Sequence, residues 1–293
     1  MATLNKKQPA LAFEKRFLKV LPTVYEINRK FGRAFAELQV LDGVAENKTA
    51  MTVKTNDLQI VVNAYDQTAI VDEKDANNRF GKLQEVIYTN TDVEYDIPLS
   101  TNVLLDVTTV NNDLDFAVAD QLIRAGEVYT VKMNEQDGTF FSTTAVIQEE
   151  IADLTDVETE AVLNKLAAAY INLEVAVDVT MYVRPDLYGA LVDSRLASTG
   201  KNSTVRIDEN EIYWFKGFRV EAVPAKYFAE GDVAYLVPDG IALPFIGISM
   251  ARAIEDSKYA GLILQTLAQG GRFVLDDNKQ AIAKVTIAGE VGG

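Results

Sequence analysis

Apolar residues recur at helical spacing near the start of the chain. Phenylalanines lie four residues apart within residues 9–39, with charged residues between them, and this spacing predicts a helix that Pro22 and Gly32 interrupt. No neighbouring stretch of sequence offers this aromatic segment an obvious packing partner. Two interpretations therefore stay open: the segment packs into the core of its own chain, or it is an arm that docks on another chain.

Residues 113–129 form a second helical pattern. Their apolar side chains fall on one stripe, and either Asn112 or Asp113 is placed to cap the first turn. Gly126 weakens the end of the stripe because glycine is a poor helix former. We therefore predict a helix over residues 113–129, followed by a turn at Asp137-Gly138.

A third helix is predicted over residues 156–173, where apolar residues form a wide stripe. Thr155 and Glu158 have the spacing of a capping box, in which each side chain satisfies an orphan amide of the first turn. The helix leads into a strand over residues 177–183. Pro185 then fits the first turn of a further short helix.

Alternation of apolar and polar residues predicts a long hairpin. Residues 51–62 alternate with a period of two, with one shift, and residues 83–97 do so near their end. The polar residues 63–82 lie between the two segments. Strands of about 10–15 residues reach roughly 33–50 Å, at ~3.3 Å per residue. A lone two-stranded ribbon is marginally stable in water, so the hairpin is expected to pack on its own domain or to reach onto a neighbouring copy.

The rest of the chain is rich in strands. We predict a hairpin with its turn at Lys216-Gly217, a strand-rich stretch over residues 258–275 that Gly270-Gly271 splits, and a turn at residues 276–279. The strands are expected at residues 211–215, 218–222, 233–237, 241–248 and 281–287. No repeat or low-complexity linker separates them.

Composition adds an uneven charge to this picture. The chain has 293 residues, 48% of them hydrophobic, which suits one large domain or two closely packed ones. The net charge is −15, but residues 1–40 carry +5 and the remainder −20. The basic segment is either a solvated helix face or an arm that lies on an acidic neighbour or on nucleic acid. The acidic remainder argues against sequence-specific DNA binding.

The residue types that are missing exclude several kinds of chemistry. The sequence has no cysteine and no histidine, so disulfides, thiolate or histidine metal sites and Ser-His or Cys-His nucleophile systems are excluded. No stretch approaches the ~20 consecutive apolar residues of a membrane helix. No secretory signal is seen at the N-terminus, so we expect a soluble chain made in a cytoplasm, with no membrane partner.

No motif singles out a catalytic, cofactor-binding or metal-ligating residue, so none is predicted, and no cofactor. The acidic run Asp208-Glu209-Asn210-Glu211 is interpreted as a solvated loop, and Asp276-Asp277-Asn278 lacks the spacing of a calcium loop. The lone Trp214 is interpreted as a core residue. Among 43 carboxylates, no pair is distinguished as an acid and a nucleophile.

Four segments carry a family resemblance in their order along the chain. They are VDVTMYVRPDLYGALVDS (177–194), EIYWFKGFRVEAVPAKYF (211–228), GDVAYLVPDGIALPF (231–245) and GGRFVLDDNKQAIAKVTI (270–287). The sequence resembles the major capsid proteins of tailed bacteriophages, the Hong Kong 97 type. The matching residues are Val183 to Leu187, Gly217 to Pro224 and Val233 to Ile241.

The resemblance implies an α+β fold of the Hong Kong 97 capsid type, with four parts. An N-terminal arm is expected at residues 1–40 and an extended hairpin loop at 48–98. A peripheral domain with a long spine helix is expected at 99–139 and 246–293, and an axial domain at 140–245.

The resemblance also implies a function without catalysis. The chain would be a structural subunit that assembles with itself into the pentamers and hexamers of an icosahedral phage head, or virion capsid, around double-stranded DNA, in the cytoplasm of a bacterial host. The implied partners are a separate scaffolding protein, a portal protein and decoration proteins. Some relatives crosslink a lysine with an asparagine; Lys48, Lys54, Lys74 and Lys82 lie in the hairpin region, but none is assigned this role.

Other functions stay open at this point. The nearest is an encapsulin-like shell protein of a protein compartment. A carboxylate-dependent hydrolase and a monomeric binding module belong to different classes. Particle size separates them, because only a shell protein forms megadalton assemblies.

Overall fold

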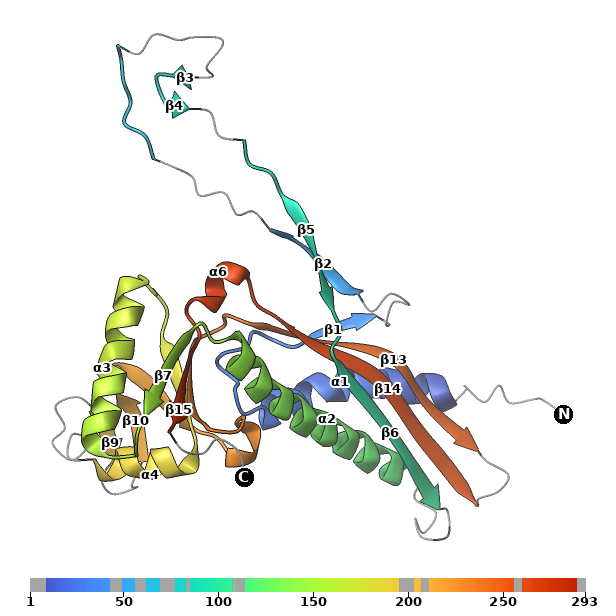
Figure 1. Cartoon of the computed structure of the whole chain (residues 1–293). Coiled ribbons are helices and arrows are strands. Elements are labelled where there is room, and N and C mark those ends of the chain that lie inside the picture. Colours follow the sequence, from blue (N-terminus) through green and yellow to red (C-terminus); the bar gives the residue numbers. More distant parts are fainter. Residues whose placement is uncertain are drawn as a thin grey trace. The chain divides into compact units, whose positions relative to one another are not determined.

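The structure is a computed structural model that describes residues 9–42, 49–55, 62–68, 77–82, 85–106, 108, 114–194, 203–206, 211–255 and 260–288 (Figure 1). The chain divides into two compact units, residues 1–44 with 95–293, and residues 45–94. Each unit is described by itself. Lys48, Lys74 and Asp208-Glu209-Asn210, which the sequence had brought into consideration, lie outside the described residues.

The larger unit contains five α-helices and two β-sheets among its described residues. The helical elements are α1 (Pro9–Asn28), α2 (Leu114–Thr144), α3 (Asp156–Asn172), α4 (Pro185–Asp193), the 3-10 turn η1 (Ala225–Tyr227) and α6 (Asp276–Lys279). The four-stranded sheet has the order β1 (Gln39–Asp42), β13 (Leu243–Glu255), β14 (Gly261–Phe273), β6 (Ile97–Asp106). The seven-stranded sheet has the order β7 (Ile147–Ile151), β15 (Ala283–Ile287), β12 (Asp232–Pro238), β8 (Val179–Val183), β11 (Phe218–Ala222), β10 (Glu211–Phe215), β9 (Ser203–Arg206).

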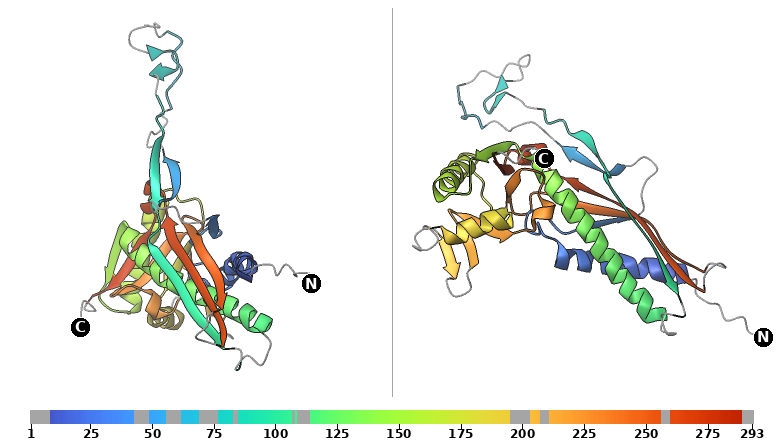
Figure 2. Two further views of the ribbon diagram at one scale, coloured as in Figure 1. Left: turned by 90° about the vertical axis from the view of Figure 1, so that its right-hand side faces the viewer. Right: turned by 60° about the horizontal axis from the view of Figure 1, so that its bottom comes forward.

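The helices α1 and α2 pack together against one face of the four-stranded sheet (Figure 2). Phe17, Leu21 and Tyr25 of α1 are fully buried in this core. Beyond the helix, Phe31 and Phe35 are buried among aromatic side chains of α2 and the other sheet. These described side chains therefore pack into their own chain, which confirms the first of the two interpretations for this segment.

The seven-stranded sheet is built around β8, whose five residues are all buried. Its core includes residues of α3 and α4, so these helices cover one face of the sheet. The predicted strands 211–215 and 218–222 form the antiparallel pair β10 and β11, as expected. Residues 283–287 were expected in the peripheral domain together with residue 246 onwards. Instead β15 pairs with β7 and β12 inside this sheet, because its alternating residues fill the core that those strands line.

The long helix α2 contradicts the predicted turn at Asp137-Gly138. The helix continues unbroken to Thr144, and both residues lie inside it. Asp137 forms a buried ion pair with Arg272. At Gly138, the main-chain carbonyl of Tyr227 approaches so closely that any Cβ would clash with it. The two residues that resembled a turn signal thus serve the packing of α2: Asp137 pairs with Arg272, and Gly138 leaves room for the carbonyl of Tyr227.

The glycine at position 126 is also explained by a close contact of α2. It lies in the middle of α2, and a Cβ there would come 3.3 Å from the Val24 side chain of α1. The glycine therefore lets α1 and α2 approach closely, and it does not mark the end of the helix as predicted.

Three further predictions about local structure need correction. The helix α3 begins at Asp156 with Thr155 at its N-cap position, as expected, but the Thr155 hydroxyl donates to Asp153 at 2.5 Å and makes no capping hydrogen bond. Strand β14 is not split at Gly270-Gly271, since Gly270 is paired with both β13 and β6 and Gly271 is paired with β13. Residues 276–279 form the short helix α6 in place of a turn.

The smaller unit, residues 45–94, contains the predicted hairpin. Strands β2 (Thr49–Thr55) and β5 (Thr89–Glu94) pair antiparallel, and β3 (Asn77–Asn78) pairs with β4 (Gly81–Lys82). Cross-strand contacts between polar side chains support the main pair, as between the Thr52 hydroxyl and Asp92 at 2.7 Å. The pairing of the two alternating segments is confirmed over these described residues.

Candidate assembly surfaces and a buried charge pair

Among its described residues, the smaller unit exposes most of the large apolar side chains. Ile87 and Tyr88 are about two-thirds exposed, at 66% and 64%. Val62, Tyr65, Phe80 and Val86 are exposed as well. A two-stranded ribbon offers little surface against which to bury such groups. An apolar surface of this kind is typical of a segment that contacts another protein chain.

The four-stranded sheet has a second face, opposite α1 and α2, that carries both apolar and polar side chains. On it, Leu104 lies beside Ile263 across the strand pair, and Leu104 is 43% exposed. Polar groups form a cross-strand ladder between these apolar positions: Arg252 donates to Gln265 at 2.8 Å, and Gln265 donates to Asn102 at 3.3 Å. This mixture of apolar area and oriented hydrogen-bonding groups suits a protein interface.

The outer side of α2 carries a third apolar surface. Phe116, Ile123 and Val131 follow one another at intervals of seven and eight residues, and all three are exposed. They lie among charged residues, including the pair in which Arg124 donates to Asp120 at 2.8 Å. The helix therefore has a second apolar line in addition to the one buried in the core.

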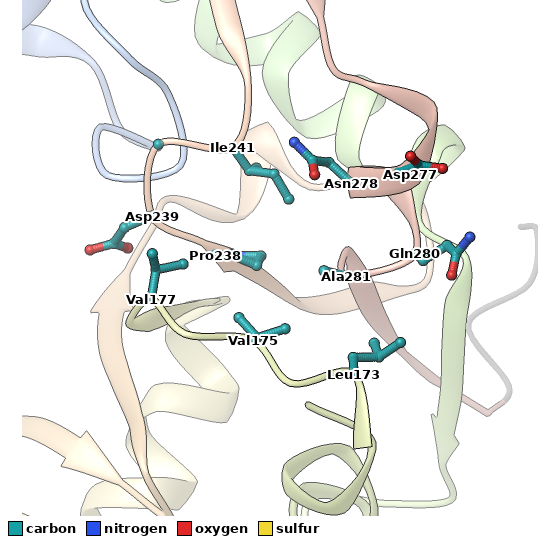
Figure 3. Close-up of a pocket in the computed structure, with 11 residues that line it drawn as sticks. Leu173, Val175, Val177, Pro238, Asp239, Ile241, Asp277, Asn278, Gln280 and Ala281 are labelled. Atoms are coloured by element: carbon teal, nitrogen blue, oxygen red, sulfur yellow. The ribbon is translucent and has the colours of Figure 1, made fainter. Parts of the chain in front are cut away.

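A hollow of about 430 Å³ lies between the end of α3, the turn after β12 and α6 (Figure 3). Its walls combine apolar side chains, such as those of Val175, Pro238 and Ile241, with polar ones from the turn after β12 and from α6. Asp239 and Asp277 lie on opposite sides of it in Figure 3. Asp239 already accepts a hydrogen bond from the Thr180 hydroxyl at 2.6 Å. The carboxylate of Asp239 is thus already bound by a side chain of β8.

A buried charge pair lies where α2 meets the four-stranded sheet. The side chains of Arg272 and Asp137 are 1% and 0% exposed, and Arg272 Nε donates to Asp137. The guanidinium also donates to the carbonyls of Gly271 at 2.8 Å and Met133 at 3.3 Å. Its central carbon lies 5.3 Å from the centre of the Phe35 ring. The pair fastens the helix to the sheet, since removing one partner would leave the other charge buried.

Burial changes the acidity of the groups around this pair. It raises the pKa of Asp137 to about 6, although the charge of Arg272 acts in the opposite direction. Burial also raises the pKa of Tyr25, and the charge of Asp137 adds to the increase. Asp137 Oδ2 and the Tyr25 hydroxyl are both buried, and neither has a hydrogen-bond partner among the described residues.

The raised pKa of Asp137 gives a testable dependence of stability on pH. Because its pKa is higher in the folded chain than the ordinary 3.8, this group stabilises the fold fully below about pH 4, and the stabilisation is lost as the pH rises through 6. We expect the stability of the wild type, relative to Asp137→Asn, to fall by on the order of 2–3 kcal/mol between pH 4 and pH 7.5. Urea unfolding of both proteins across this range measures their free energies of unfolding. Equal changes of the two free energies with pH would contradict the prediction.

The described residues that the sequence analysis singled out lie on different elements of the fold. Trp214 is partly buried on β10, with the guanidinium of Arg219 4.9 Å from its ring centre. Lys54 lies on β2 of the smaller unit, and Asp276 begins α6. Within the described part of the chain, no three acidic side chains gather into a possible metal site. The helices described there are also too short or too polar to cross a membrane.

Comparisons with known proteins bear on the fold. No protein-family model matches the sequence, and no curated protein does. Among solved structures, the capsid of the cyanophage P-SCSP1u is similar with 12% identity and a TM-score of 0.61, over 86% of each chain. The mature capsid of bacteriophage PhiM1 is similar with 8% identity and a TM-score of 0.60, over 86% of this chain and 85% of that one.

A virus-like particle from Pyrococcus furiosus is also similar, with 10% identity and a TM-score of 0.51, over 93% of this chain and 99% of the other. At these identities the likeness concerns the fold. The chain has a mixed α+β fold of the Hong Kong 97 capsid type, and the predicted fold class is confirmed.

Proposed function

We propose that this chain, having the fold of capsid subunits, is the structural subunit of an icosahedral shell and forms the head of a tailed bacteriophage around double-stranded DNA. The observation that carries the proposal is a capsid fold shared over more than four-fifths of the chain with two phage capsid structures. Both matches cover 86% of this chain, so they are not limited to a single motif. A structural role, with no catalytic centre, follows from it.

The exposed surfaces support assembly. The apolar side chains of the hairpin in one copy would cover the open face of the four-stranded sheet in a neighbouring copy. In a ring, each copy would cover the sheet of one neighbour and have its own sheet covered by the hairpin of another. Each Å² of apolar area buried in this way contributes roughly 25 cal/mol before ordering costs. Many copies then stabilise one another where a single chain leaves these side chains in water.

We assign the four-stranded sheet with α1 and the first half of α2 to the peripheral domain, and the seven-stranded sheet to the axial domain. Under this proposal the axial domain lies at the centre of each pentamer or hexamer. The net charge of −15 would let packaged DNA lie close to the wall without sticking to it. Scaffolding, portal and decoration proteins complete the set of proposed partners.

The alternative with support of its own is a shell with another content. The similarity to the virus-like particle covers nearly all of both chains, so an encapsulin-like compartment has the same structural basis. A carboxylate-dependent hydrolase has less support. The strongly perturbed carboxylate of Asp137 is fully enclosed and does not line the hollow described above.

Particle formation tests the proposal. The chain is expressed together with a scaffolding protein from a phage gene neighbourhood. The size of the resulting assemblies is measured by sedimentation velocity and negative-stain microscopy. We expect closed megadalton particles, and nuclease-resistant DNA inside mature ones would favour the phage head over the compartment. A chain that stays at 32 kDa at high concentration with scaffold present would overturn the proposal.

The hairpin surface gives a more specific prediction. Replacing Ile87 with aspartate is expected to raise the concentration needed for assembly by on the order of tenfold or more, because a buried apolar contact is lost at every subunit. The stability of the unassembled chain should change by less than about 0.5 kcal/mol, since the side chain is exposed in it. Ile87→Val is the matched control and should assemble as the wild type does. Normal assembly of Ile87→Asp would exclude this surface from the interface.

A further inference from the structure

The helix α1 presents a line of basic side chains to solvent. Four exposed residues follow one another along one side of the helix, at intervals of three and four positions: Arg16, Lys19, Thr23 and Ile27. The opposite side of the helix is buried against α2 and the four-stranded sheet (Figure 2). The exposed residues are therefore carried by a helix that the core beneath it holds in place.

Lys30 extends this line beyond the end of α1. Its main-chain amide donates to Asn134 Oδ1 at 3.0 Å, and Asn134 Nδ2 donates to the carbonyl of Asn28 at 3.3 Å. Asn134 is buried in α2, so it fixes the backbone where the helix ends. The side chain of Lys30 is exposed. We call the whole set the basic line: Arg16, Lys19, Thr23, Ile27 and Lys30.

The cations of the basic line have no partner among the described residues. Arg16, Lys19 and Lys30 form no ion pair, side-chain hydrogen bond or ring contact there. Every other arginine or lysine of the larger unit whose side chain is described contacts a carboxylate, another polar acceptor or an aromatic ring. These residues are Arg29, Arg33, Arg124, Lys132, Lys165, Arg184, Lys216, Arg219, Lys226, Arg252, Arg272, Lys279 and Lys284. Although the chain has 43 acidic residues, it leaves the cations of this one surface free.

The surroundings of the basic line keep it positive. The nearest acid in sequence on the exposed side of α1 is Glu26, and its carboxylate is already paired with Arg29 at 2.8 Å. The sequence adds further positive charge at Lys6, Lys7 and Lys15. An anion that approaches α1 therefore meets several cations and one neutralised carboxylate.

The composition of the basic line suits the phosphates of DNA better than the surface of a protein. The centres of protein interfaces are depleted of charged residues, whereas cations lie all along this line and Ile27 is its one large apolar side chain. Interfaces with DNA are much more positive, and lysine, arginine and threonine side chains commonly donate to phosphate oxygens. At ~1.5 Å per residue, residues 16–28 span about 18 Å. That length of duplex carries on the order of ten phosphates.

We propose that the basic line is a sequence-independent contact for the phosphate backbone of double-stranded DNA. The inference rests on the proposed function for the presence of DNA beside the chain, and it names the surface that touches it. The remainder of the chain has a net charge of −20 and repels the duplex. Each copy therefore contributes one weak contact through α1, and this contact is lost as salt rises. Many copies would hold the DNA at regular points of a wall that otherwise repels it.

The experiment measures binding of the unassembled full-length chain to a fluorescent DNA duplex of about 20 base pairs, by fluorescence anisotropy. We expect the affinity of the wild type to fall about 40-fold between about 50 and about 200 mM salt, as neutralisation of three phosphates predicts. The α1 variant carries Arg16→Gln, Lys19→Gln and Lys30→Gln. Its affinity at the lower salt concentration should be about tenfold weaker or more, with a much smaller dependence on salt. A wild type that does not bind the duplex at the lower salt concentration would overturn the proposal.

A matched control removes three cations from other places. Arg124→Gln, Lys132→Gln and Lys165→Gln together change the net charge by the same amount, but each of these exposed side chains is paired with a carboxylate. This variant should bind the duplex within about threefold of the wild type, because salt screens its distant charges. Equal losses in the two triple variants would mean that net charge governs binding, and the basic line would not be the site.

Competition identifies the kind of anion. Unlabelled duplex should displace the fluorescent duplex more effectively than polyglutamate at the same concentration of charge, because the charges of DNA are more densely spaced. Equal displacement by polyglutamate would assign the basic line to an acidic polypeptide and overturn the contact with DNA.

Particle formation separates this inference from the proposed function. Because the basic line would face DNA and not a neighbouring copy, the α1 variant should form particles with scaffold as the wild type does. Failure of the wild type to form particles would remove the shell function, whereas binding of DNA is measured on the unassembled chain and is decided separately. Loss of particles in the α1 variant alone would place the basic line between copies, and the proposed contact with DNA would be wrong.

Discussion

Replacing Arg272 with methionine is expected to lower the free energy of unfolding by about 3–5 kcal/mol at pH 7.5, because the carboxylate of Asp137 is then buried without its cation. Methionine keeps much of the arginine's volume, so the loss is electrostatic and not mainly a cavity. Urea unfolding followed by circular dichroism measures it. The fluorescence of the lone Trp214 reports the seven-stranded sheet in the same experiment.

Two further variants identify the cause of this loss. Arg124→Met removes the arginine of an exposed pair with Asp120 on the same helix and should cost less than about 1 kcal/mol. The double variant Arg272→Met with Asp137→Leu removes both charges and should recover a large part of the stability. A double variant as unstable as Arg272→Met alone would mean that the buried charge is not the cause.

Replacing Gly138 with alanine is expected to destabilise the chain by about 3 kcal/mol or more, although alanine is the better helix former. The added methyl group would overlap the main-chain carbonyl of Tyr227, which cannot rotate away as a side chain does. Either α2 or the segment around η1 must then move. Thermal unfolding and the near-ultraviolet circular dichroism of the packed aromatic side chains measure the change.

The matched control is Gly189→Ala in α4. Gly189 is also helical, but a Cβ there meets nothing within 4 Å. This variant should be neutral or more stable by up to about 1 kcal/mol, as helix propensity alone predicts. Equal effects of the two substitutions would mean that the approach of Tyr227 does not constrain α2.

Sequence patterns predicted a helix or strand correctly where neighbouring residues alone determine it. Alternation over residues 51–62 and 83–97 predicted a hairpin, since side chains on a strand point to opposite sides in turn. Pro185 predicted the start of α4, because the first turn of a helix does not need the amide hydrogen that proline lacks. The extent of α2 depended on contacts from far along the chain. Neither Arg272 nor Tyr227 can be inferred as a neighbour of residues 137 and 138 from sequence spacing.

One signal for the buried charge pair was nevertheless present. Tyr129, Met133, Asp137 and Phe141 lie four residues apart on one stripe, and the structure buries all of them. A single charged residue on an otherwise apolar helical stripe is evidence of a buried partner of opposite charge. The sequence could thus have indicated that Asp137 is paired, although not with which of its 28 basic residues.

The place of β15 in the seven-stranded sheet affects how the chain folds as it is synthesised. β7 and β12 are made long before residues 283–287 leave the ribosome, and β15 is the strand that joins them. Until then both present open edges, and β7 has no partner strand among the described residues. A nascent chain therefore cannot offer a finished sheet to other molecules, and pairing across such a long separation in sequence is slow to form. Closure of the sheet by its last strand thus delays the presentation of native surfaces until synthesis has passed residue 287.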